Sequence, residues 1–159
     1  MKIIGVDPGY DRCGVAVLER GQDGKDRVLE SVCITTSGED SFENRLLTVI
    51  REFRALLDKH APDICALEQL YFTKNQKTAM RVAETRGALI VTAHERGIRI
   101  TEYGPGEVKV ALTGNGRASK EQVMAMVQRI SPIQNENVLD DEYDAIAVAL
   151  TAATMIRWN

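Results

Sequence analysis

The sequence predicts a single α/β domain over residues 1–159, and two observations support this fold class. The first 36 residues contain apolar, β-branched segments separated by tight turns, which is typical of short antiparallel strands. From residue 41 onward, segments with helical periodicity alternate with short apolar segments, as in α/β proteins. A chain of this length buries one sizeable core, and no linker or internal repeat interrupts it.

The first three strands are predicted at residues 3–7, 12–19 and 27–36. Residues 3–7 are apolar and end on Asp7, and Pro8 and Gly9 then stop the strand and turn the chain. Residues 21–24 form a second reverse turn. Because both connections are so short, we expect the three strands to form an antiparallel meander.

A helix and a fourth strand are predicted next. Asp40 followed by Glu43 resembles a capping box, and apolar residues then recur at helical spacing as far as His60. Residues 63–67 form a short apolar strand that leads into Glu68. Since a helical crossover produces parallel strands, Asp7 and Glu68 should project from the same edge of the sheet, where ligands bind in such folds.

The second half of the chain should contain a long helix, a fifth strand and three further helices. The long helix spans residues 76–96 and carries small residues at intervals of four, at Ala79, Ala83 and Gly87. These residues either pack the helix on its own sheet or form a helix–helix seam between two chains. A strand at 98–101, a short helix at 107–112, a flexible basic loop at 114–118 and a helix opened by Ser119 and Gln122 follow.

The last helix is predicted to begin near Asp140 with a cluster of acids. Asp140, Asp141 and Glu142 fit the ordinary preference for acids at a helix N-terminus. Asp144 fits this explanation less well, because the apolar residues that follow it indicate a buried helix. Together, Asp7, Glu68, Asp141 and Asp144 offer oxygen ligands for a hard divalent cation such as Mg²⁺.

Composition bounds the class of protein and its compartment. The net charge is −3, but residues 74–129 hold ten basic against five acidic residues, an excess of five that favours a basic surface. The longest apolar run is too short to cross a bilayer, and the N-terminus lacks a signal-peptide pattern. Three widely spaced cysteines show no metal-ligand or redox spacing, so we expect a cytoplasmic protein with reduced thiols.

Four motifs in one order resemble those of the RuvC family of Holliday-junction resolvases, in the ribonuclease-H-like superfamily. They are IIGVDPG near the start, ALEQLYFTKN, GNGRASKEQV, and DDEYDAIAVA near the end. The resemblance spans essentially the whole chain. It implies a five-stranded mixed sheet whose first three strands are antiparallel, with helices on both faces. It also implies a homodimer that makes paired symmetric nicks in four-way DNA junctions.

The resemblance assigns roles to individual residues. Asp7, Glu68, Asp141 and Asp144 match the family's metal-binding carboxylates, with Mg²⁺ as the expected metal and Mn²⁺ as an alternative. The helix at 76–96, with Ala79, Ala83 and Gly87, matches the family's dimer helix, and a branch-migration motor complex is an implied partner. Expected DNA contacts are Tyr71, Phe72, Lys74, Lys109, Arg117 and Lys120, and either Tyr71 or Phe72 stacks on a base near the junction centre.

Three other functions are alternatives to junction cleavage, and the sequence bears on each differently. A related ribonuclease-H-like nuclease acting on RNA or non-junction DNA would keep the same carboxylates. An actin-like ATPase or sugar kinase shares the GVDPG opening but needs a second such domain, for which this length leaves no room. A non-catalytic DNA-binding dimer would be favoured by a missing carboxylate, and none is missing.

Overall fold

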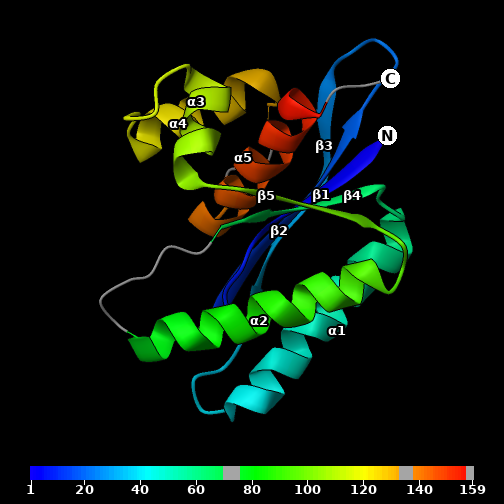
Figure 1. Cartoon of the computed structure of the whole chain (residues 1–159), viewed down its shortest axis with the longest axis vertical. Coiled ribbons are helices and arrows are strands. Elements are labelled where there is room, and N and C mark those ends of the chain that lie inside the picture. The colour runs from blue at the N-terminus through cyan, green and yellow to red at the C-terminus, as the bar shows by residue number, and fades with distance from the viewer. Residues whose placement is uncertain (70–75, 133–137, 157–159) are drawn as a thin grey trace.

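A five-stranded mixed sheet forms the centre of the molecule in the computed structural model, which describes residues 1–69, 76–132 and 138–156 (Figure 1). The strands lie in the order β3-β2-β1-β4-β5. Strands β1 and β2 are antiparallel, as are β2 and β3, whereas β4 runs parallel to both β1 and β5. This confirms the predicted meander and the predicted crossover. The bounds are β1 Lys2–Asp7, β2 Arg12–Arg20, β3 Asp26–Thr35, β4 Ile64–Glu68 and β5 Arg99–Tyr103.

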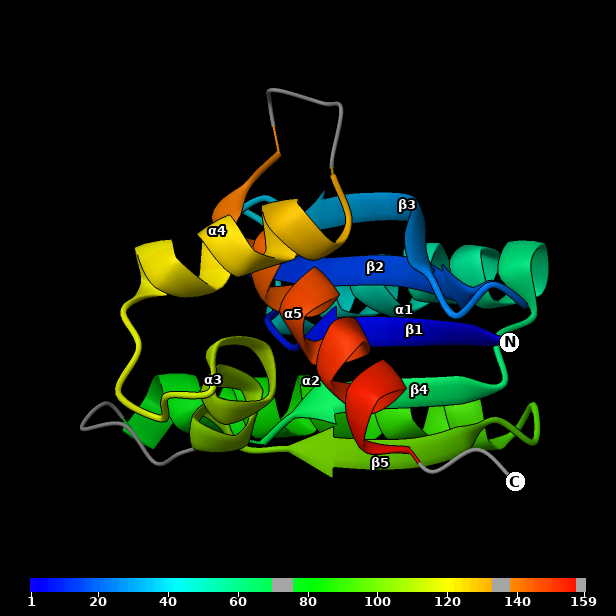
Figure 2. The same ribbon diagram turned by 90° about the horizontal axis from the view of Figure 1, so that it is seen from above.

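Helices cover both faces of this sheet, as expected. Helices α1 (Phe42–His60) and α2 (Gln76–His94) lie on one face. Helices α3 (Pro105–Thr113), α4 (Lys120–Ile130) and α5 (Asp140–Met155) lie on the other (Figures 1 and 2). Within the described residues, no helix is both long and apolar enough to cross a membrane.

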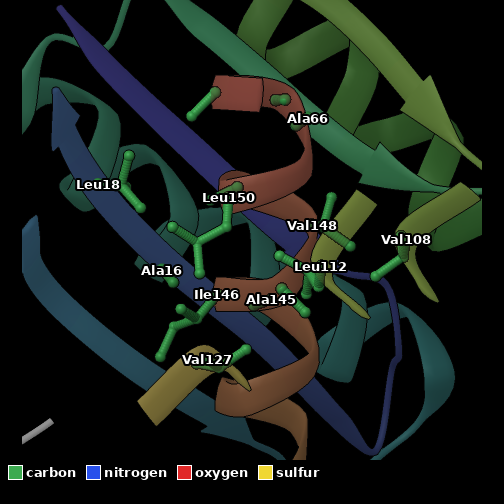
Figure 3. Close-up of a cluster of buried hydrophobic side chains, with 14 of the residues drawn as sticks. Ala16, Leu18, Ala66, Val108, Leu112, Val127, Ala145, Ile146, Val148 and Leu150 are labelled. Atoms are coloured by element: carbon green, nitrogen blue, oxygen red, sulfur yellow. The ribbon is translucent and has the colours of Figure 1, made fainter. Parts of the chain in front are cut away.

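The alternation of side chains along β1 separates two cores. Ile3 faces the cluster formed with α3, α4 and α5, whereas Ile4 and Val6 face the cluster formed with α1 and α2. Figure 3 shows the first cluster, in which Ile146 and Leu150 of α5 lie against β2. Helix α5 is buried along almost its whole length, so its position relative to β1 and β2 is fixed by packing.

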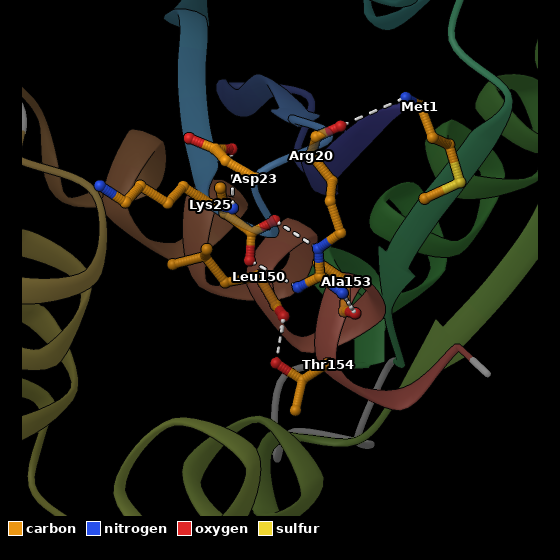
Figure 4. Close-up of polar contacts among 8 residues, drawn as sticks. Met1, Arg20, Asp23, Lys25, Leu150, Ala153 and Thr154 are labelled. Atoms are coloured by element: carbon orange, nitrogen blue, oxygen red, sulfur yellow. Dashed lines mark hydrogen bonds and ion pairs between the residues drawn. The ribbon is translucent and has the colours of Figure 1, made fainter. Parts of the chain in front are cut away.

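Arg20, at the end of β2, fixes the other end of α5. Its guanidinium donates to the carbonyl of Ala153 at 2.5 Å and to both carboxylate oxygens of Asp26, at 2.8 and 2.7 Å (Figure 4). Such a bidentate pair is geometrically specific. The C-terminal half of α5 is therefore tied to the β2–β3 hairpin.

Several element boundaries differ from the predicted ones. The N-cap of α1 is Ser41 rather than Asp40, because the Ser41 hydroxyl accepts from the Asn44 amide at 3.3 Å. Strand β5 continues to Tyr103, and α3 already begins at Pro105, the position in a first turn where a missing amide hydrogen costs nothing. Helix α2 ends at His94, before the left-handed turn at Gly97.

Candidate metal centre

Asp7 and Glu68 lie at equivalent positions on neighbouring parallel strands. Val6 of β1 is in register with Leu67 of β4, so the next residue on each strand is one of these two acids. Side chains alternate along a strand, and Ile3 of β1 and Ala66 of β4 both face the α5 side of the sheet. Asp7 and Glu68 are therefore on that side as well, at the carboxyl end of the strands, as predicted.

The start of α5 lies directly on the sheet beside them, because two glycines allow close approach. A Cβ atom at Gly14 would lie 1.9 Å from the carbonyl oxygen of Asp141, and one at Gly5 would lie 2.2 Å from that of Ala145. No other residue fits at either position. Gly14 pairs with Asp7 across the β1–β2 ladder, so the N-terminal end of α5, with Asp141 and Asp144, is held next to the end of β1.

These four acids influence one another electrostatically. Burial, followed by the charges of Glu68, Asp144 and Asp141, raises the pKa of Asp7 from 3.8 to about 7. Burial and the charge of Asp144 also raise the pKa of Glu68. In the absence of a cation, the folded chain therefore retains a proton at Asp7 far above the usual pH range of an aspartate.

Two basic side chains offset part of this negative charge. The Lys120 ammonium lies 3.0 Å from a carboxylate oxygen of Asp144 and 3.4 Å from one of Asp140. It also acts to lower the pKa values of Asp7 and Glu68. The Arg12 guanidinium, at the start of β2, forms an ion pair with Asp141.

Asp140 and Glu142 have the structural role that the sequence suggested for acids at a helix start. The Glu142 carboxylate accepts from the Leu139 amide at 3.2 Å and from the Ser31 hydroxyl at 2.6 Å, so it caps α5 and ties it to β3. Asp140 is exposed and contacts Lys120. Asp141 and Asp144 are the two remaining acids near the start of α5, and each forms an ion pair with a basic side chain.

The four carboxylates lie near one another, but they do not surround a single position as the ligands of a bound ion do. In the described part of the chain, no three His, Cys, Asp or Glu side chains are grouped tightly enough to hold one ion. Arg12 and Lys120 instead pair with oxygens of Asp141 and Asp144. The donor set nevertheless fits a hard divalent cation, since it consists of carboxylates that repel one another without a cation between them.

The remaining predicted site residues lie in different places. Lys109 lines a hollow of about 180 Å³ together with Glu68, Lys120 and Asp144. Arg117 is exposed on the connection between α3 and α4. Tyr71, Phe72 and Lys74 lie outside the described residues.

The row of small residues on α2 faces away from the sheet. Ala83 and Gly87 are exposed, and a Cβ atom at Gly87 would meet nothing within 4 Å. The buried positions of α2 include Thr85, Leu89 and Ala93, on another side of the helix. The interpretation that the small residues pack α2 on its own sheet is therefore wrong.

The sequence did not predict that Arg12 contacts Asp141. Their pairing joins residues far apart in the chain, and no spacing rule predicts it. A signal was present in the alternation of β2, where Arg12 lies two residues before Gly14 and so on the same face. Because the backbone of Asp141 lies directly against Gly14, a side chain two residues away on the same face of β2 can reach the Asp141 carboxylate.

We call the end of the sheet that carries Asp7 and Glu68, with Asp141 and Asp144 of α5 beside it, the acidic edge. The strand order, the helical crossover and this acidic edge together define the class of protein as ribonuclease-H-like. A family model described as crossover junction endodeoxyribonuclease RuvC matches residues 3–152. The chain therefore belongs to the RuvC family.

Relatives with that description cover nearly all of the chain. The protein of Thermosipho melanesiensis is 40% identical over 99% of this chain and all of its own length. That of Thermotoga petrophila is 39% identical over 99% of this chain and 94% of its own.

Solved structures agree with this assignment. The structure of T. thermophilus RuvC in complex with Holliday junction substrate has a TM-score of 0.89 at 32% identity, over 97% of this chain and 93% of that one. The yeast mitochondrial Holliday junction resolvase Ydc2 shares the fold, with a TM-score of 0.69 at 14% identity, over 96% of this chain and 78% of that one.

Proposed function

We propose that this chain is a divalent-metal-dependent endonuclease that resolves four-way DNA junctions by paired symmetric nicks. Asp7, Glu68, Asp141 and Asp144 are its metal-binding and catalytic carboxylates. The observation that carries this proposal is their concentration at one edge of the sheet, where burial and the charges of the other three acids raise the pKa of Asp7 to about 7. Membership of a family of crossover junction endodeoxyribonucleases supports the substrate.

Mg²⁺ is the proposed metal, and Mn²⁺ is the alternative with the same oxygen ligands. When bound, such ions supply Lewis-acid stabilisation of the phosphate and lower the pKa of water. The chain holds these acids in fixed positions. Strands β1 and β4 fix Asp7 and Glu68. The close packing of α5 against Gly5 and Gly14 fixes Asp141 and Asp144.

Lys120 has two roles in this proposal. Without metal, its ammonium neutralises Asp144 and Asp140. Released from these acids, the Lys120 ammonium would stabilise negative charge that develops on the scissile phosphate. Lys109, which lines the same hollow, contacts the phosphate backbone beside it. Arg117, Tyr71, Phe72 and Lys74 are the further proposed DNA contacts.

Two nicks in one junction require two active sites, and α2 offers a surface for pairing two chains. Its exposed side carries Met80, Ala83, Gly87 and Val91, and the exposed fractions of Met80 and Val91 are 64% and 57%. Small residues between larger apolar ones allow two helices to approach closely. We therefore place the dimer seam on α2.

The cellular setting follows from the same assignment. A branch-migration motor is the proposed partner, since resolution needs a junction moved to a cleavable position. The cytoplasm is the proposed location, in keeping with three free thiols at Cys13, Cys33 and Cys65.

Cleavage of a synthetic four-way junction tests this function. The wild type with Mg²⁺ is compared on the junction, linear duplex, single strand and an RNA–DNA hybrid, with Asp144→Asn as the inactive control. We expect paired symmetric nicks on the junction alone, lost in the control. Cleavage of the hybrid or single strand in place of the junction would keep the metal site but refute the substrate.

A further inference from the structure

A second hollow lies at the same end of the molecule as the acidic edge, on the opposite face of the sheet. It has a volume of about 410 Å³, and we call it the α1–α2 cleft. Both helices that form it begin at the lower left of Figure 1. Its lining residues combine aromatic rings with cations, and they are Tyr10, Phe42, Arg45, Lys77, Thr78 and Arg81.

In the α1–α2 cleft, each arginine lies over an aromatic ring. The rings of Tyr10 and Phe42 meet edge to face with centroids 5.6 Å apart. The Arg45 guanidinium lies 4.7 Å from the Tyr10 centroid, and that of Arg81 lies 4.0 Å from the Phe42 centroid. Cation–π contacts of this kind fix the guanidinium planes before any ligand arrives.

The balance of charge leaves this cleft able to bind an anion. Arg45 pairs with Asp11 and donates to the Thr36 hydroxyl at 2.9 Å, and Arg81 pairs with Glu84 at 3.0 Å. The Glu43 carboxylate is also within reach of the Arg81 charge. None of these three acids is among the described residues that line the cleft. Lys77 is exposed and forms no ion pair within the described residues. Among the described residues, the lining therefore presents three cations and no carboxylate. Two of the cations are guanidinium groups, which can bind phosphate in a bidentate manner.

The α1–α2 cleft lies a short distance from the acidic edge. Tyr10 follows Asp7 by three residues, so their Cα atoms lie at most about 11 Å apart. Successive phosphates of one DNA strand advance by about 3.4 Å along a duplex. A strand whose scissile phosphate is at the carboxylates therefore reaches the α1–α2 cleft within a few nucleotides.

We propose that the α1–α2 cleft binds the phosphodiester backbone of the junction a few nucleotides from the scissile phosphate. This inference rests on the proposed function, because the same junction must occupy the acidic edge. The arginines cover the ring faces, so the cleft offers cations rather than a stacking surface for a base. Its contribution to affinity is accordingly independent of sequence and sensitive to salt.

The test compares two pairs of neutralising substitutions with equal change in charge. Lys77→Gln with Arg81→Gln alters the cleft. Arg51→Gln with Arg54→Gln is the matched control on exposed positions of α1, turned well away from Arg45 on the helix. Junction binding is measured by fluorescence anisotropy in EDTA across a series of NaCl concentrations, and thermal unfolding verifies that each variant folds.

The cleft variant should bind the junction about tenfold more weakly at moderate salt, with the slope of log Kd against log[NaCl] reduced by about two. The single variant Lys77→Glu, at an exposed position, should also weaken binding. The control pair should match the wild type in affinity, slope and cleavage rate.

Two unfavourable outcomes are distinguishable. Equal affinity and slope for the cleft and control variants, with a wild type that cleaves the junction, would overturn the cleft alone. A wild type that neither binds nor cleaves the junction would overturn the proposed function and this inference with it.

Discussion

At the scale of single residues, the raised pKa of Asp7 reflects its burial and its repulsion by neighbouring acids. Its carboxyl group is held by β1 among three other acids, and its pKa is about 7. A group with a raised folded-state pKa binds its proton more tightly in the folded than in the unfolded chain. Stability of the metal-free protein therefore falls as pH rises from about 4 to about 7, and the penalty is complete above that pKa.

The variant Asp7→Asn removes this penalty and also a carboxylate that we propose as a metal ligand. In EDTA at pH 8, we expect it to melt several degrees above the wild type, since each kcal/mol corresponds to about 2–4 °C for a chain of this size. The difference should shrink as the pH is lowered toward 4. Thermal unfolding followed by circular dichroism measures it. Asp140→Asn, an exposed neighbour of Lys120, is the control, and an equal response of both variants would contradict the account.

Residue identities alone located the acids but not their counter-ions. Asp7 and Glu68 were predictable because each ends an apolar strand, and the helix between those strands made them parallel. The ion pair of Arg12 with Asp141 depends on how closely α5 approaches β2 at Gly14. That distance is a property of the packed molecule, so a local pattern does not encode it.

At the scale of elements, Arg86 of α2 connects the long helix to the acidic edge. Its side chain donates to the backbone carbonyl of Glu68 at 3.3 Å and forms an ion pair with Glu102 of β5 at 2.5 Å. The ends of β4 and β5 are thereby tied to the helix that we place at the dimer seam. Arg86 thus holds the backbone at Glu68, and we predict that it positions this carboxylate for catalysis.

Substituting Arg86 by Gln should lower the rate of junction cleavage about tenfold if Glu68 is catalytic as proposed, because small displacements of a catalytic group are costly. Junction affinity in EDTA should stay within about twofold, since Glu68 is not a DNA contact. Arg96→Gln is the matched control, because Arg96 also joins a backbone carbonyl and an acid, Thr92 and Asp58, away from the site. Parallel losses of rate and affinity in Arg86→Gln would argue against a positioning role.

Helix α2 also carries the prediction about assembly. Gly87→Glu adds a charge to the exposed apolar row without a clash inside the chain, since a Cβ atom there meets nothing within 4 Å. We expect sedimentation velocity to show a dimer for the wild type and a monomer for this variant. Gly38→Glu, also open but on the β3–α1 connection, is the control and should leave the dimer intact. A dimeric Gly87→Glu protein would place the seam elsewhere.

Elements were predictable in kind and order, and less so at their ends. Turn chemistry identified the meander, and the helical period identified α1. The acids at the start of α5 and the apolar residues that follow them identified this last helix. Ser41 caps α1 in place of Asp40, and α3 starts at Pro105, because cap choice depends on which hydroxyl or carboxylate reaches a free amide in the folded chain. The orientation of the small residues on α2 likewise required the position of the sheet.

On the scale of the whole molecule, the distribution of charge matters more than its sum. The net charge is only −3, yet residues 74–129 hold twice as many basic as acidic residues. The same end of the sheet combines four carboxylates with Lys109, Lys120 and the α1–α2 cleft. A carboxylate cluster flanked by cations can approach a polyanion that the carboxylates alone would repel.

The central claim is that Asp7, Glu68, Asp141 and Asp144 form one metal centre, and Mn²⁺ binding tests it most directly. Electron paramagnetic resonance counts the free ion as metal-free protein is titrated, without reference to DNA or cleavage. Single variants replace each acid by Asn or Gln, and Asp140→Asn controls for the loss of a neighbouring charge. We predict that the wild type and the control bind Mn²⁺ alike and that all four variants bind it at least tenfold more weakly. Wild-type affinity in the Asp7 or Asp144 variant would contradict a shared centre.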